Sequence, residues 1–127
     1  MSCRGIRGAI TVTANNKENI IAACKELLEE MVQANGIEID EVAAILFTTT
    51  QDLNAEFPAA ATRELAWPQH LALLCGHEMN VPNSLHRCLR ILMLVNTEKG
   101  TEEIKHIYLR EARGLKRSAP IIPGGKT

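Results

Sequence analysis

The sequence predicts one α+β domain, in which a mainly antiparallel or mixed β-sheet packs against a long helix. Three observations lead to this fold class. One segment carries apolar residues at helical spacing, several short apolar segments have the composition of strands, and no internal repeat or linker divides the 127 residues. A single copy of a chain this size buries only about two-thirds of its unfolded surface, which leaves room for an oligomer to add stability.

The N-terminal part is predicted to form a strand followed by the long helix. Residues 4–12, RGIRGAITV, have the pattern of a strand that carries two arginines. Asn15 and Glu18 have the spacing of a helix N-cap and its capping partner, and Asn35-Gly36 is a typical stop signal. Between them, apolar residues recur at helical spacing: Ile20, Ile21, Cys24, Leu27, Leu28, Met31 and Val32. This amphipathic helix is expected to cover one face of the sheet.

The middle of the chain is predicted to contain two buried strands, joined by a loop and a short helix. Residues 42–50, VAAILFTTT, and residues 71–75, LALLC, are apolar and have the composition of buried strands. Between them, Pro58 stands at a place that the first turn of a helix tolerates. The segment PAAATREL is therefore expected to be a short helix.

The last part of the chain predicts two more strands and a tail. In residues 88–96, CLRILMLVN, strand alternation places four side chains on one face: Cys88, Arg90, Leu92 and Leu94. Residues 101–103 are expected to form a helical turn before a last strand at 106–109, HIYL. Residues 1–117 are thus interpreted as a single domain, and 118–127, SAPIIPGGKT, as a flexible C-terminal tail.

Composition and motifs argue against several classes of function. Fourteen basic and fifteen acidic residues give a net charge of −1, which disfavours nucleic acid or an anionic membrane as the main partner. No apolar stretch reaches membrane-spanning length and the N-terminus lacks a signal-peptide core, so we expect a cytoplasmic protein. The cysteines and histidines have no metal-type or redox spacing and no glycine-rich phosphate loop is present, so neither a metal nor a cofactor is expected.

Charged side chains inside apolar strands are the clearest indication of a functional site. Arg7 and Arg90 lie in predicted strands, where a cation needs a partner or a cavity. One interpretation is a structural ion pair, for Arg90 with Glu78 or Glu111. The other is that these arginines, together with Arg63 from the short helix, bind an anionic small molecule. The residues alone lead no further than an anion-binding α+β domain.

Five segments resemble, in order, the AroH-type family of chorismate mutases. They are RGIRGAITV, the stretch T-x-D-L-x-A-x-F-P-A-x-A-x-R-E-L from Thr50 to Leu65, the C-x-x-E of Cys75 to Glu78, CLRILMLV and HIYL. The resemblance extends from about residue 3 to residue 117. It implies a homotrimer whose sheets form a pseudo α/β-barrel, with active sites between adjacent subunits. It also implies the Claisen rearrangement of chorismate to prephenate in phenylalanine and tyrosine biosynthesis, without a cofactor.

The resemblance implies roles for residues that, taken singly, are equally compatible with packing or solvent exposure. Arg90 would face the ether oxygen of chorismate, where negative charge develops. Arg7 would bind a carboxylate, with Tyr108 donating to it. Glu78 would accept a hydrogen bond from the ring hydroxyl, joined by the region of Cys75.

The resemblance also implies a periphery for this site. Phe57 and Leu115 would form apolar walls, and Arg63 would add positive charge at the mouth. Near the C-terminus, where the family usually has an arginine after the leucine, this chain has Lys116 and then Arg117. Either residue could supply the positive charge of that arginine, although the side chain of Lys116 lacks a planar guanidinium group.

Two other functions are compatible with an anion site of this kind. A trimeric enamine/imine deaminase of the RidA type would need one carboxylate-binding arginine and a positioned water. It would not require Arg7, Glu78 and Arg90 together, so mutation of Glu78 would matter little. A non-catalytic sensor of an anionic metabolite would bind chorismate without converting it.

Overall fold

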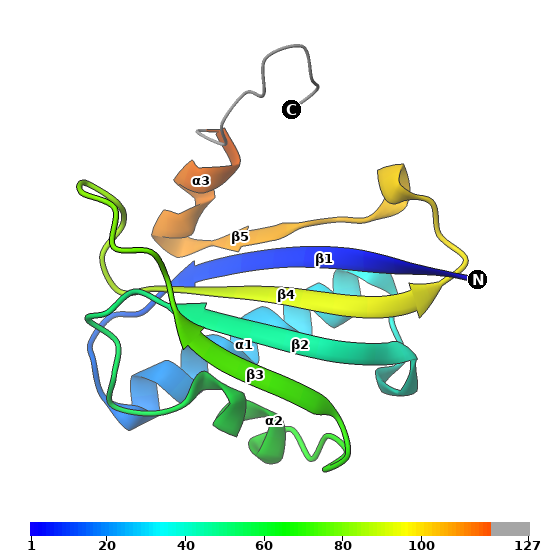
Figure 1. Ribbon diagram of the computed structural model, residues 1–127, viewed down its shortest axis with the longest axis horizontal. Helices are drawn as coiled ribbons and strands as arrows, with labels where there is room; N and C mark the ends of the chain where they lie inside the picture. Colours follow the sequence, from blue (N-terminus) through cyan, green and yellow to red (C-terminus); the bar gives the residue numbers. More distant parts are fainter. Residues whose placement is uncertain (118–127) are drawn as a thin grey trace.

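The computed structural model describes residues 1–117, except for the side chains of Lys116 and Arg117; the predicted tail at 118–127 lies outside the described residues. Five strands form one mixed sheet in the order β3-β2-β4-β1-β5 (Figure 1). Central β4 is antiparallel to β1 and β2, while the edge strands β3 and β5 run parallel to β2 and β1. The predicted α+β class with a mixed sheet is confirmed. The strands are β1 (Ser2–Thr11), β2 (Val42–Thr49), β3 (Ala72–His77), β4 (Cys88–Thr97) and β5 (Ile107–Leu109).

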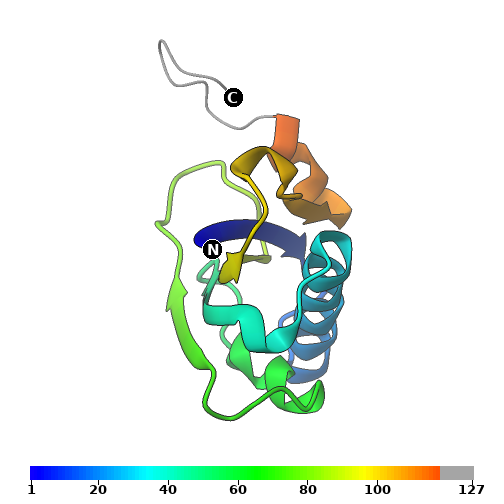
Figure 2. The ribbon, with the colours of Figure 1, turned by 90° about the vertical axis from the view of Figure 1, so that its right-hand side faces the viewer.

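The long helix α1 (Lys17–Asn35) packs on one face of this sheet, and Figure 2 shows α1 and the short helix α2 (Ala61–Glu64) on the same side. As predicted, Pro58 begins a helical turn before α2, and residues 101–103 form another turn. No helix among the described residues is long and apolar enough to span a membrane. The remaining elements are η1 (Ile39–Glu41), η2 (Pro58–Ala60), η3 (Thr101–Glu103), η4 (Arg110–Ala112) and α3 (Arg113–Arg117).

Local sequence determines both ends of α1, but the helix begins one residue later than predicted. Asn16, not Asn15, is the N-cap, and its side chain accepts a hydrogen bond from the backbone N–H of Asn19 at 2.8 Å. Asn15 instead accepts a hydrogen bond from the backbone N–H of Asn54, in the loop after β2. At the other end, Gly36 adopts a φ of 59° and its N–H returns to carbonyls of the last turn, as the predicted stop requires.

One continuous apolar core lies between α1 and the sheet. The predicted helix face supplies it, and alternation along β4 sends every second side chain into it: Leu89, Ile91, Met93 and Val95. Close packing depends on Gly8 of β1. A Cβ at this position would lie 2.5 Å from Sδ of Met31 and 3.1 Å from Cδ1 of Leu27. The second glycine of RGIRGAITV therefore lets α1 approach the sheet.

No long helix of residues 1–117 covers the opposite face of the sheet, here called the open face. Strand register places four leucines on this face: Leu46 of β2, Leu74 of β3, and Leu92 and Leu94 of β4. Leu74 is 64% exposed. The prediction of a buried strand at 71–75 is therefore wrong, because β3 is an exposed edge strand. Apolar composition does not distinguish a strand buried within one chain from a strand that presents apolar side chains at the surface.

A histidine side chain links β1 to the segment before β5. The backbone N–H of Arg7 donates to Nδ1 of His106 at 2.9 Å. Burial lowers the pKa of His106, and the positive charge of Arg7 lowers it further. The folded chain therefore favours the neutral ring, which is the form that can accept this hydrogen bond.

Gly8→Ala is expected to lower the free energy of unfolding by about 1–3 kcal/mol, because the added methyl group forces Met31 and Leu27 to repack. Urea unfolding at fixed protein concentration measures the change. Gly76→Ala is the matched control, because no atom lies within 4 Å of the Cβ that it adds. If both variants were as stable as the parent, the close approach of α1 to β1 would not depend on Gly8.

The pKa of His106 is lowered in the folded chain and lies near the ordinary histidine value of about 6.5 in the unfolded chain. Between these two pKa values, the contribution of His106 to the free energy of unfolding is expected to rise with pH. In this range the unfolded chain binds more protons than the folded chain, so this contribution to stability is complete above the range and is lost as the pH falls through it. Urea unfolding across the range should show a smaller pH slope for His106→Asn than for the parent. The exposed histidine variant His70→Asn serves as the control, and an unchanged slope in His106→Asn would contradict the assignment.

Candidate active site

A hollow of about 300 Å³ on the open face collects side chains from four strands and from the residue that follows β3. The register of the sheet explains why they meet, because one row of paired residues crosses all five strands: Gly76, Thr48, Arg90, Ala9 and Tyr108. Arg7 lies in the neighbouring row, opposite Leu92. The structure thus brings four of the predicted site residues into one pocket: Arg7, Glu78, Arg90 and Tyr108.

Arg90 and Glu78 form the charged centre of this pocket. Nε of Arg90 lies 3.4 Å from Oε2 of Glu78, and the side chains are 45% and 31% exposed. The ion pair considered for Arg90 is therefore formed, with Glu78, but it lines a cavity instead of the core. Among the described residues, Arg90 makes no ion pair with Glu111, the other partner considered. An ion pair this exposed stabilises the fold little, and both groups remain accessible to a ligand.

Arg7 and Tyr108 line the same pocket from β1 and β5. Arg7 forms no ion pair with a carboxylate in the part of the chain that the structure describes, so its charge is available to an anion. Tyr108 is partly buried and packs, together with Leu115 of α3, against Ala9 and Cys88. Leu115 therefore packs on the same small cluster as Tyr108, but it is not among the residues that line the pocket.

The other predicted site residues lie elsewhere on the chain. Phe57 and Cys75 line a separate hollow of about 340 Å³. Cys75 packs against the core on the α1 side, whereas Phe57, just before η2, is 71% exposed. Arg63 is exposed on α2 and lines neither hollow, and the side chain of Lys116 lies outside the described residues. Within one chain, the predicted site residues are thus divided between the two hollows, and Arg63 and Leu115 lie outside both.

The thiols near these hollows are not activated as nucleophiles. Burial raises the pKa of Cys75. Burial also raises the pKa of Cys88, and the positive charge of Arg90 opposes this shift only in part. A thiol with a raised pKa stays protonated near neutral pH and attacks poorly. The described residues contain no group of three or more His, Cys, Asp and Glu side chains that could hold a metal ion.

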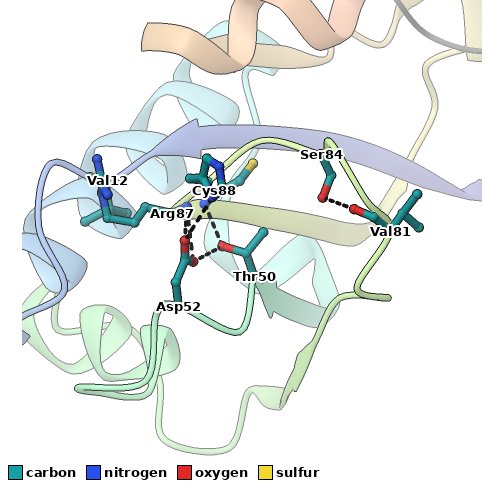
Figure 3. Close-up of polar contacts among 8 residues, drawn as sticks. Val12, Thr50, Asp52, Val81, Ser84, Arg87 and Cys88 are labelled. Atoms are coloured by element: carbon teal, nitrogen blue, oxygen red, sulfur yellow. Dashed lines mark hydrogen bonds and ion pairs between the residues drawn. The ribbon is translucent and has the colours of Figure 1, made fainter.

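A polar network, missed by the sequence analysis, fixes the start of β4 two residues before Arg90 (Figure 3). Asp52 accepts two hydrogen bonds from the backbone N–H of Arg87, and the hydroxyl of Thr50 accepts one from the N–H of Cys88 at 2.9 Å. Partial burial acts to raise the pKa of Asp52, but hydrogen bonds from Thr50 and Arg87 hold it below its usual value. The T-x-D spacing from Thr50 to Asp52 was the signal that could have revealed this network.

The sequence analysis also missed Thr48 of β2. Its hydroxyl donates a hydrogen bond to Oε2 of Glu78 at 2.6 Å, and its side chain lines the pocket. A threonine in a strand is an ordinary strand former, so no signal in the sequence singled it out. The pocket therefore offers two cations on strands and one oriented carboxylate just after β3, an arrangement that can bind a small molecule with anionic groups and a hydroxyl.

Known proteins match this chain over most of its length. A family model described as chorismate mutase type I matches residues 3–119. A Thermus thermophilus protein named chorismate mutase AroH is 46% identical over 114 residues, which cover 89% of this chain and 93% of the relative. A Bacillus subtilis protein of the same name is 40% identical over 111 residues, which cover 87% of each chain.

A solved structure agrees with these sequence matches. The structure of a chorismate mutase from Clostridium thermocellum matches with a TM-score of 0.86 and 46% sequence identity, over 88% of this chain and 99% of that chain. The fold and the family model therefore lead to one conclusion: the chain belongs to the type I chorismate mutase family.

Proposed function

We propose that this chain is a chorismate mutase that catalyses the Claisen rearrangement of chorismate to prephenate, a step of phenylalanine and tyrosine biosynthesis. The family match and the two relatives of that name support the reaction. The observation that carries the site assignment is the open-face pocket that unites Arg7, Arg90 and Glu78. The family match favours this function over the deaminase and the sensor considered above.

The reaction explains why such a pocket suffices. Chorismate carries two carboxylates, a ring hydroxyl and an enolpyruvyl ether, and its rearrangement is intramolecular. The enzyme has to hold the compact reactive conformer and to stabilise the charge that shifts as the carbon–oxygen bond breaks. A million-fold acceleration would require a barrier lower by about 8 kcal/mol, shared between these two effects.

Four polar side chains of the pocket have roles in this proposal. Arg90 faces the ether oxygen and stabilises the negative charge that develops there. Arg7 binds a carboxylate of chorismate, and the hydroxyl of Tyr108 donates to the same group. Glu78 accepts a hydrogen bond from the ring hydroxyl, so it orients the substrate and removes no proton.

The second part of the proposal is a homotrimer with active sites between adjacent subunits and sheets arranged as a pseudo α/β-barrel. The exposed leucines of the open face support it, because apolar side chains at a sheet surface gain from burial against another copy. The division of the site supports it too. A neighbouring subunit would bring Phe57 and Arg63 to the pocket of Arg90, where the region of Cys75 would join Glu78. Leu115 and Lys116 would then close the site from the C-terminal side.

Purified protein is expected to convert chorismate to prephenate without an added cofactor, followed as loss of chorismate absorbance with the product identified. Arg90→Ala should lower kcat by about 100-fold to 1,000-fold or more, because the charge developing on the ether oxygen loses its main partner. Arg4→Ala is the matched control, since this β1 arginine instead donates to the carbonyl oxygen of Lys99. Substantial turnover by a folded Arg90→Ala variant would contradict the role given to Arg90.

If each active site is shared between two subunits, variants that lack residues from different sides of the site should complement each other. Arg90→Ala and Arg63→Ala chains, unfolded together and refolded, should form hybrid trimers in which one site combines an intact Arg90 with an intact Arg63 from the neighbour. Activity should then exceed the average of the two variants refolded alone, weighted by their shares of the mixture, and sedimentation should give the mass of three copies of the 14.0 kDa chain. Mixing the folded variants without unfolding is the control. No gain in activity from verified hybrids would show that each site is built within one chain.

A further inference from the structure

Thr48 lies between the two charged groups of the proposed active site. Its Oγ1 donates to Oε2 of Glu78 at 2.6 Å, and Nε of Arg90 lies 3.4 Å from the same oxygen. The threonine contact is therefore the closer of the two, at a length typical of a strong O–H···O⁻ hydrogen bond. The longer arginine contact leaves the guanidinium less firmly tied to Glu78 than the threonine hydroxyl is.

The sheet register places Thr48 where it can make this contact. Thr48 of β2 pairs with Arg90 of β4 on one side and with Gly76 of β3 on the other. Gly76 has no side chain, and no atom lies within 4 Å of the place where its Cβ would be. The side chain of Glu78, two residues beyond Gly76, can therefore reach back to β2. The backbone N–H of Glu78 also donates to the carbonyl oxygen of Thr49 at 2.8 Å, which fixes the chain at this point.

The hydrogen bond has two consequences for the carboxylate. Thr48 engages Oε2, so Oε1 of Glu78 can accept a further hydrogen bond. The same contact opposes rotation of the carboxylate into a bidentate pair with the guanidinium of Arg90, the strongest arrangement that these two groups can form. A guanidinium in such a pair would direct its donors at Glu78 and away from a ligand.

We infer that Thr48 is a positioning residue of this enzyme, which orients Glu78 toward the substrate hydroxyl and keeps Arg90 available for the ether oxygen. This inference rests on the proposed function, because it assigns to Thr48 an effect on two groups of the proposed site. Thr48 acts through Glu78 and forms no required contact with chorismate.

The test compares Thr48→Val, which keeps the branched shape but lacks the hydroxyl, with Thr48→Ser, which keeps the hydroxyl. Thr48→Val should lower kcat by about tenfold or more, the effect of losing one hydrogen bond to a charged group, with a smaller change in KM. Thr48→Ser should restore kcat to within about threefold of the parent, since its hydroxyl can donate to the same carboxylate oxygen. Equal kcat values for Thr48→Val and the parent, or an equal loss in both variants, would overturn the inference.

Thr97→Val is the matched control for removing a strand hydroxyl. Thr97 is a buried residue at the opposite end of β4, where its Oγ1 accepts a hydrogen bond from the N–H of Lys99. This variant should keep the parent kcat, and thermal unfolding of all variants should show that the fold is retained. A tenfold loss of kcat in folded Thr97→Val as well would assign the effect to the sheet in general and would overturn the inference.

A double-mutant cycle with Glu78→Ala separates positioning from direct contact. If Thr48 acts through Glu78, Thr48→Val should cause no further loss of kcat in the Glu78→Ala background. A full additional loss would mean that Thr48 contacts the substrate itself, which overturns the inference but leaves the proposed function intact. Absence of chorismate conversion by the parent would instead refute the proposed function, and the inference would fall with it.

Discussion

The pairing of β4 with strands on both sides is the constraint on which the rest of the structure depends. Alternation along β4 sends Leu89, Ile91 and Met93 toward α1 and sends Arg90 and Leu92 to the open face. A slip of one residue in the register would turn Arg90 into the apolar core and expose Leu89, Ile91 and Met93. The core therefore keeps the register in place, and the register in turn positions the charged groups of the proposed site.

The close approach of α1 connects stability to the site in the same way. Gly8 has no side chain, so Met31 and Leu27 can pack directly on β1 between Arg7 and Ala9. The strand is thus held firmly from the core side, while its open-face neighbour Arg7 lines the pocket. Rigid strands held from behind suit a reaction that depends on placing charges and moves no proton.

Periodicity predicted much of the fold, because alternation and helical spacing report which face is buried. It correctly predicted the face of β4 that carries Arg90 and the core face of α1. It failed to distinguish Asn15 from Asn16 as the N-cap of α1, and the second of these residues caps the helix. It failed again at 71–75, where the strand is exposed. A strand that faces the core and a strand that another copy of the chain could cover have the same apolar composition.

The family resemblance singled out the charged residues of the site, but their arrangement depends on contacts that a sequence does not encode locally. Arg7, Glu78, Arg90 and Tyr108 come together only through strand pairings between distant segments. Cys75 is separated from them because it faces the α1 side of the sheet, and Phe57 because it lies in the loop before η2. Thr48 gave no signal, because its importance lies in one hydrogen bond to a residue thirty positions away.

The open face combines two surfaces that differ in polarity, and their adjacency bears on catalysis. The row with Thr48 and Arg90 is polar, whereas the next row along the strands pairs Leu74 with Leu46 and Leu46 with Leu92, and reaches the charged Arg7 only at β1. In the proposed trimer, a neighbouring subunit would bury the leucine row and exclude water from the edge of the polar row. Charges in a drier pocket interact more strongly, so the assembly that buries the leucines would also strengthen the hold of Arg90 on the ether oxygen. Without the proposed trimer, this chain would lack both the part of its site that a neighbour supplies and the low-dielectric setting of the part that it supplies itself.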